Sequence, residues 1–91
     1  MQNMQALALA ATILLAPGVA LASPDCTREP QAKWMPQEAM KGRIDELGYK
    51  VKVFKVTGSC YEIYGWTKED KRAEVYFNPV TGEIVESEVE G

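Results

Sequence analysis

The sequence predicts an α+β fold in which one amphipathic helix packs on a three- to four-stranded antiparallel meander sheet. A single segment with helical periodicity is followed by up to four short segments that alternate between apolar and polar residues. Only short turns separate these segments, so neighbouring strands are expected to run antiparallel. An amphipathic helix has to bury its apolar stripe, and a sheet with one apolar face provides the surface for it.

The helix is expected within "MPQEAMKGRIDELGY", the segment from 35 to 49. Pro36 suits the first helical turn, where its missing N–H is not needed. Met40, Ile44 and Leu47 fall on one stripe at helical spacing. Gly48 fits the left-handed position that often ends a helix. The pattern therefore predicts about three turns of helix that lie on another element.

Strands are expected at 49–56, 60–66 and 72–78, with a short last strand at 83–89. In the first strand the alternation slips at Phe54 and Val56, which indicates a β-bulge. One face of the sheet is expected to lie beneath the helix. Its members are Val51, Val53, Tyr61, Ile63, Val75 and Phe77.

Residues 1–22 are predicted to form a signal peptide, because they contain no charged side chain and include an apolar run from Ala6 to Ala16. Ala20-Leu21-Ala22 is typical of a signal peptidase site, with cleavage before Ser23. A transmembrane anchor is the alternative, but a span needs about 20 apolar residues, and Pro17-Gly18 interrupts this run. We therefore expect a periplasmic or secreted protein with no stable membrane insertion after cleavage.

The mature chain is expected to comprise an extended lead-in at 23–35 and a single domain at 36–89. Its 10 basic and 13 acidic residues give a net charge of −3. Nucleic-acid binding is not expected, because proteins that bind nucleic acids usually have a strong excess of basic residues.

The two cysteines, Cys26 and Cys60, are expected to form a disulfide after export to an oxidising compartment. The bridge closes a loop of about 35 residues and stabilises the domain by ~3.8 kcal/mol in the chain-entropy model. A redox-active pair is the alternative, but the chain has no Cys-x-x-Cys spacing and no histidine to lower a thiol pKa. The disulfide then pins the lead-in to the sheet. We expect the lead-in to wrap around the sheet end and partly shield the second face.

No catalytic residue, metal site or cofactor is predicted. The chain lacks histidine, the usual general base and a frequent metal ligand. A Ser–Lys dyad is conceivable, but so short a chain leaves little room for a cleft. Asp45-Glu46 and Glu69-Asp70 resemble acid–base or calcium-binding pairs, but they are expected to be solvated surface.

Two surfaces are candidate binding sites. Tyr64, Trp66 and Tyr76 are expected on the face opposite the helix, either as a binding face or as packing under the lead-in. Lys50 and Lys52 are expected on the edge formed by the first strand. They are a candidate interaction edge, although lysines also protect edge strands from unwanted pairing.

Three motifs in order resemble the PepSY family of small secreted domains. They are "W-x-P-x-E-A" from Trp34, "GYKVKVFKVTGSCYEIYG" from Gly48 and "EVYFNPVTGEIV" from Glu74. The resemblance covers about 34–86. The chain departs from the family at Thr67–Lys71, where members often carry an Asp-Gly type of turn.

The resemblance implies a protein partner, with a role in inhibiting or modulating a peptidase, and it brings no catalytic residues. The chain is thus expected to be a non-catalytic binding domain that acts on a peptidase or another envelope protein. The alternative is a periplasmic sensor or carrier of a small molecule or envelope component, which uses the same aromatic face as a shallow site.

Overall fold

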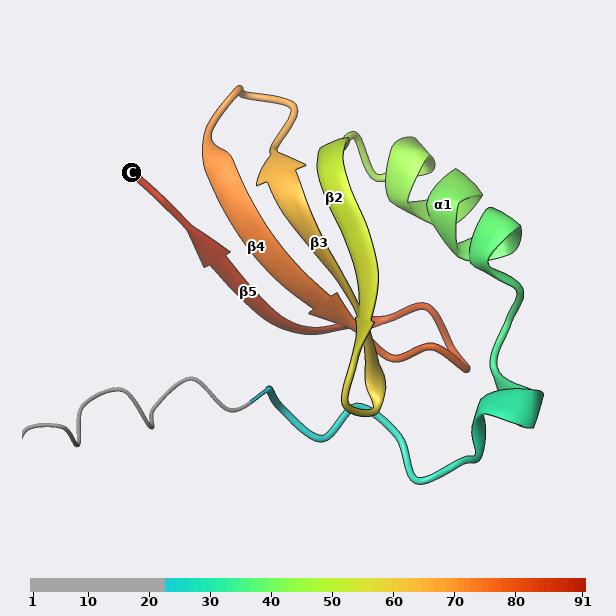
Figure 1. Ribbon diagram of the computed structural model, residues 1–91. Helices are drawn as coiled ribbons and strands as arrows, with labels where there is room; N and C mark the ends of the chain where they lie inside the picture. Colours follow the sequence, from blue (N-terminus) through green and yellow to red (C-terminus); the bar gives the residue numbers. More distant parts are fainter. Residues whose placement is uncertain (1–22) are drawn as a thin grey trace, which may run out of the picture.

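A computed structural model describes residues 23–91, and the signal peptide predicted for 1–22 lies outside the described residues. The elements are the 3₁₀ turn η3 (Gln31–Lys33), the helix α1 (Gln37–Glu46), and four strands, β2 (Lys50–Thr57), β3 (Cys60–Trp66), β4 (Arg72–Phe77) and β5 (Ile84–Val89). The strands form an antiparallel sheet of order β2-β3-β4-β5, with α1 beside it (Figure 1). The predicted α+β class is confirmed. Within 23–91, no helix is long and apolar enough to span a membrane.

Helix α1 begins after Pro36 and buries Met40 and Ile44 completely. Gly48 has a φ of 94°, the left-handed conformation expected at the helix end. The prediction that Leu47 continues the buried stripe is wrong, because the helix ends at Glu46 and Leu47 is 40% exposed. The helix therefore contacts the sheet through fewer apolar side chains than its spacing predicts.

The bulge predicted in the first strand is present, as a register shift between Val51 and Val53. After the shift Val53 pairs with Tyr64, and Phe54 pairs with Ile63. Because paired residues share a face of the sheet, Phe54 joins the core and Val53 lies on the opposite face. The expectation that Val51 and Val53 lie buried beneath the helix is wrong, since the shift places Val53 on the opposite face and Val51, which pairs with Gly65, is 43% exposed on the edge strand.

Gly65 is required beside this bulge. A Cβ atom at Gly65 would lie 2.0 Å from the carbonyl oxygen of Lys50, a distance that no side chain tolerates. Glycine in a strand often marks such a close backbone approach. The glycine in β3 thus allows the backbone of β2 to approach closely at the bulge.

The core lies between α1 and the sheet. Seven buried residues form it: Met40, Ile44, Tyr61, Ile63, Ala73, Val75 and Phe77. The Tyr61 hydroxyl donates a hydrogen bond of 2.7 Å to the carbonyl oxygen of Met35, which joins the sheet to the segment before the helix. The aromatic rings of Trp34 and Tyr61 pack edge to face, with centroids 5.3 Å apart.

The predicted disulfide between Cys26 and Cys60 is present, with a Cα–Cα distance of 5.2 Å. The Cys26 N–H also donates to the Ser59 hydroxyl at 2.9 Å. From there the lead-in passes around the end of the sheet, and the Met35 N–H donates to the carbonyl oxygen of Pro79 at 2.9 Å (Figure 1). The expected wrap around the sheet end is thus observed, although the lead-in contains the 3₁₀ turn η3 and is not extended throughout.

The turn between β3 and β4 has no Asp-Gly sequence, and Asp70 takes the left-handed conformation, with a φ of 66°. Aspartate tolerates this region better than most residues. The Thr67 hydroxyl accepts hydrogen bonds from the N–H groups of Glu69 and Lys71, each 3.2 Å long. These bonds close the turn without a glycine.

Candidate binding face

The face of the sheet opposite α1, called here the open face, carries a mixture of charged, aromatic and small polar side chains. The cross-strand pairs define it, because directly paired residues lie on the same side of a sheet. Lys55 pairs with Glu62, and Glu62 pairs with Tyr76. In the next row Val53 pairs with Tyr64, and Tyr64 pairs with Glu74.

One end of the open face is closed by the disulfide. Cys26, Cys60 and Tyr76 form a second buried cluster, and Tyr76 is only 9% exposed. Tyr64 remains 40% exposed, and Trp66 is half-buried. The structure therefore separates the three predicted aromatic residues, since Tyr76 packs under the lead-in while Tyr64 and Trp66 stay accessible.

Glu62 lies in the middle of the open face and is 1% exposed. The Thr57 hydroxyl donates to its Oε1 at 2.6 Å, and Lys55 Nζ lies 3.9 Å from the same oxygen. Its Oε2 is buried and receives no hydrogen bond from a donor group within 23–91. Glu74 of β4 lies beside this carboxyl group, and a proton on Glu62 would allow the two carboxyl groups to form a hydrogen bond.

Glu62 and Glu74 share this proton. Burial raises the pKa of Glu62, and the hydrogen bond with Glu74 raises it further, since both favour the neutral carboxyl group. The same hydrogen bond lowers the pKa of Glu74, because it stabilises the carboxylate that accepts the proton. The two groups titrate as a pair, with one proton held between them over an intermediate pH range.

Two tyrosine hydroxyls complete this polar cluster around Glu74. Tyr76 Oη donates to Glu74 Oε2 at 3.0 Å, and burial followed by this hydrogen bond raises the pKa of Tyr76. The hydrogen bond from Tyr64 to Glu74 is the main cause that raises the pKa of Tyr64 to about 12. Lys55 Nζ lies 5.3 Å from the centroid of the Tyr64 ring. Side chains from three strands thus meet in one polar cluster.

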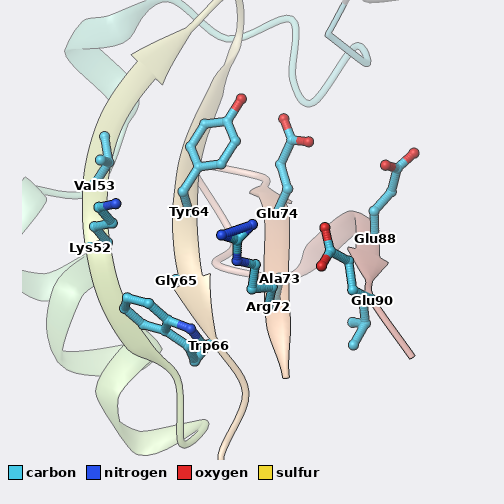
Figure 2. Close-up of a pocket in the computed structure, with 11 residues that line it drawn as sticks. Lys52, Val53, Tyr64, Gly65, Trp66, Arg72, Ala73, Glu74, Glu88 and Glu90 are labelled. Carbon is cyan, nitrogen blue, oxygen red and sulfur yellow. The ribbon is translucent and has the colours of Figure 1, made fainter. Parts of the chain in front are cut away.

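Beside this polar cluster the open face is hollowed into a groove of about 470 Å³. Tyr64 and Trp66 of β3 line it together with Arg72 and Glu74 of β4 (Figure 2). Lys52 and Val53 of β2 border it on one side, and Glu88 and Glu90 border it on the other. Its lining thus combines aromatic surface with charges of both signs, a composition that suits a peptide or another ligand with both polar and apolar parts.

The structure also separates the two lysines predicted at the edge. Lys50 Nζ lies 2.6 Å from Asp70 Oδ1 in an exposed ion pair. Lys52 lines the groove with Tyr64 and Trp66. The burial of Glu62 is not predicted by the sequence pattern. The only sequence signal is its position between Cys60 and Tyr64 on the same face of the strand.

Fold and site together define a small disulfide-linked α+β domain with an open, grooved sheet face. Among residues 23–91, no group of three or more side chains is arranged to hold a metal ion. The chain belongs to the PepSY_2 family, described as "Peptidase propeptide and YPEB domain", whose family model matches residues 6–88. No curated protein and no solved structure matches the chain significantly.

Membership confirms the resemblance found in the sequence motifs. The chain is thus a peptidase-propeptide-like domain, a class that is generally regulatory and not catalytic. The disulfide and the family are both consistent with an extracytoplasmic location.

Proposed function

We propose that this protein is an exported, non-catalytic binding domain that inhibits or modulates a peptidase or another envelope protein, and that it acts in the periplasm or as a secreted protein. The observation that carries the proposal is the groove on the open face, in a chain that belongs to a peptidase-propeptide family. In this proposal the partner contacts Tyr64 and Trp66 directly.

The accessible aromatic surface supports this role. Tyr64 and Val53 are both exposed and pair across β3 and β2, and Trp66 lies on the same side of β3. Tyrosine and tryptophan dominate the binding energy of many protein interfaces.

The shifted pKa values of the open face have a structural explanation. The buried Glu62 shares its proton with Glu74, and Tyr76 donates to the same Glu74 carboxylate. The carboxyl groups of Glu62 and Glu74 form their hydrogen bonds within the sheet and so hold the neighbouring side chains of the binding surface in place. This supports the assignment of Glu62 and Glu74 to the scaffold of the groove, with the contact to the partner made by Tyr64 and Trp66.

A second candidate function is a sensor or carrier of a small molecule or envelope component. The size of the groove favours it, because about 470 Å³ falls within the range of small-ligand sites. In this alternative the ligand stacks on Trp66, and Arg72 or Glu74 pairs with its charged groups. The two functions differ in what remains bound when the protein is purified gently.

The test uses the disulfide-linked protein as bait in an extract of the oxidising compartment, followed by mass spectrometry of what is bound. The Tyr64→Ala/Trp66→Ala variant removes the aromatic surface, and Leu47→Ala/Val56→Ala is the matched control, since both of its residues are exposed and lie outside the groove. We expect the wild type and the control to retain a stoichiometric protein whose peptidase activity changes on binding.

The aromatic variant is expected to lose that protein. Equal capture by all three forms would contradict the groove as the binding site. A small molecule in native mass spectra, with no protein partner, would instead support the sensor or carrier.

A further inference from the structure

Within the described residues 23–91, the outer edge of β5 is unpaired. The strand order makes β2 and β5 the two edges of the sheet, and every residue of Ile84–Val89 is exposed. Within 23–91, β4 is the only strand paired with β5, and α1 lies on the far side of the molecule near β2 (Figure 1). A free strand edge presents backbone donors and acceptors that can pair with another chain.

The register identifies which backbone groups face outward. Residues 73 to 76 pair with 89, 88, 87 and 86 in turn, and the Glu90 N–H donates to the carbonyl oxygen of Arg72 at 2.9 Å. In an antiparallel pair, hydrogen-bonded and non-hydrogen-bonded positions alternate. Glu90 and Glu88 therefore direct their N–H groups toward β4, whereas Ser87 and Val89 direct theirs outward. An added strand would bond to Ser87 and Val89.

The edge formed by β2 has features that prevent pairing with other strands, and β5 lacks them. Strand β2 has a bulge between Val51 and Val53 and carries Lys50, Lys52 and Lys55, and both features discourage pairing with other strands. From Ile84 to Val89 there is no lysine and no proline. The register shift of β5 lies at its beginning, opposite Tyr76 and Phe77, and the rest of the strand is regular.

The charge of this region indicates what the edge would bind. The segment from 73 to 91 contains no lysine or arginine, and its five acidic residues are Glu74, Glu83, Glu86, Glu88 and Glu90. Glu86 and Glu88 lie on the open face, because they pair with Tyr76 and Glu74. Residues that alternate along an added strand would lie directly opposite them. Lysine or arginine at those positions would meet glutamate, whereas another acidic strand would be repelled.

We propose that β5 accepts an extended cationic peptide segment as a fifth strand of the sheet. The segment bonds to the outward backbone groups of Ser87 and Val89, and its alternate lysine or arginine side chains pair with Glu86 and Glu88. This inference deepens the proposed binding function by naming the chemistry of the partner segment. It does not depend on the contact with Tyr64 and Trp66.

The probe is a blocked peptide of about seven residues that alternates lysine and threonine, the length of an ordinary strand. A matched peptide with glutamate in place of lysine is the control. Both are added to the disulfide-linked protein, and amide exchange and chemical shifts are followed by NMR. We expect the cationic peptide to slow exchange at the Ser87 and Val89 amides by about tenfold or more, and added salt to weaken its affinity.

Further variants distinguish the contribution of the backbone hydrogen bonds from that of the charged side chains. Ser87→Pro removes an outward N–H but no bond to β4, whereas Ser87→Ala retains it. We expect Ser87→Pro to lower the affinity for the cationic peptide by about tenfold or more, and Ser87→Ala to bind the peptide as the wild type does. Glu86→Gln/Glu88→Gln should weaken binding and reduce its salt dependence, and it tests the proposal even if the proline variant fails to fold. The Tyr64→Ala/Trp66→Ala variant should bind the peptide as the wild type does, which distinguishes this site from the groove.

Several results would overturn the proposal. They are equal binding of the acidic peptide, equal binding by Ser87→Pro and Ser87→Ala, and protection that appears at β2 and not at β5. A second copy of the chain is the competing occupant, because its lysine-bearing β2 edge also complements β5. Self-association in ultracentrifugation that Ser87→Pro and Lys52→Glu both abolish would assign the edge to that copy and contradict the cationic-peptide proposal.

Discussion

The two faces of the sheet are built from the same strands but differ in composition and burial. The face beneath α1 is apolar and closed, and Ile63, Val75 and Phe77 are fully buried there. The open face carries Glu62, Tyr64 and Glu74 on the alternate positions of the same two strands. Because side chains alternate along a strand, β3 and β4 place their buried apolar residues on one side of the sheet and their polar and accessible aromatic residues on the other.

The open face is itself divided along its length. At one end the disulfide and Tyr76 are covered by the lead-in, and at the other end Tyr64 and Trp66 line the groove. The carboxyl pair lies between them. The bridge thus anchors one end of the face, and the other end remains accessible to a partner.

The largest effect is expected from the closed face. Phe77→Ala should lower the free energy of unfolding by about 3–5 kcal/mol, because it leaves a cavity among fully buried side chains. Trp66→Ala on the open face is the comparison and should cost less than about 1.5 kcal/mol, since Trp66 is already partly exposed to solvent. Urea denaturation measures both values. Equal losses would mean that the open face is also core.

Removal of the disulfide tests how the open face is anchored. Cys60→Ser should lower the free energy of unfolding by roughly 2–5 kcal/mol, since the bridge joins the lead-in to β3. Cys26→Ser should cost a similar amount, and the double variant should cost little more, because both changes break one bond. Additive losses in the double variant would show that the cysteines act through their packing and not through the bridge.

The carboxyl pair predicts a pH dependence that the closed face cannot produce. The raised pKa of Glu62 means that its contribution to stability is present at low pH and is lost as pH rises through that pKa. The lowered pKa of Glu74 means that its contribution is lost as pH falls through that pKa. The free energy of unfolding should therefore be highest between the two pKa values.

Glu62→Gln tests this dependence, because glutamine is neutral at every pH and still donates a hydrogen bond to Glu74. The variant should lose the decline in stability on the alkaline side. The exposed Glu86→Gln is the control and should keep the wild-type profile. Urea midpoints from about pH 4 to about pH 8 measure the effect, and identical slopes in wild type and Glu62→Gln would contradict the shared proton.

The smallest effect is expected at Tyr64. Tyr64→Phe removes the hydroxyl that donates to Glu74 but keeps the ring, so it should cost about 0.5 kcal/mol at this exposed position. The ring should still bind a partner. A loss of partner affinity in Tyr64→Phe would show that the hydroxyl, and not the aromatic surface, makes the contact.

The sequence predicts the elements well because periodicity and turn residues act locally. The helix, the strands and their antiparallel order follow from such signals, whereas the disulfide follows from two cysteines in a chain that is expected to be exported. The bulge was also predicted, but its position was not. A shift of one residue moves Val53 to the open face and Phe54 into the core, so two residues change roles.

The candidate site depends on side-chain contacts between strands, and these contacts cannot be predicted from a single sequence. Glu62 alternates with aromatic residues and resembles a solvated position. In the folded protein its carboxyl group interacts with Thr57 on one neighbouring strand and with Glu74 on the other. In the same way, Tyr64 and Tyr76 look equivalent in the sequence. The lead-in covers Tyr76 and leaves Tyr64 exposed.

The central claim is that the grooved end of the open face binds a partner while the closed face maintains the fold. The most direct measurement is the affinity of the captured partner for the wild type and for Tyr64→Ala/Trp66→Ala, with circular dichroism of both forms. The account predicts an affinity at least about tenfold lower in the variant, which corresponds to about 1.4 kcal/mol, with an unchanged spectrum. Unchanged affinity, or an unfolded variant, would contradict it.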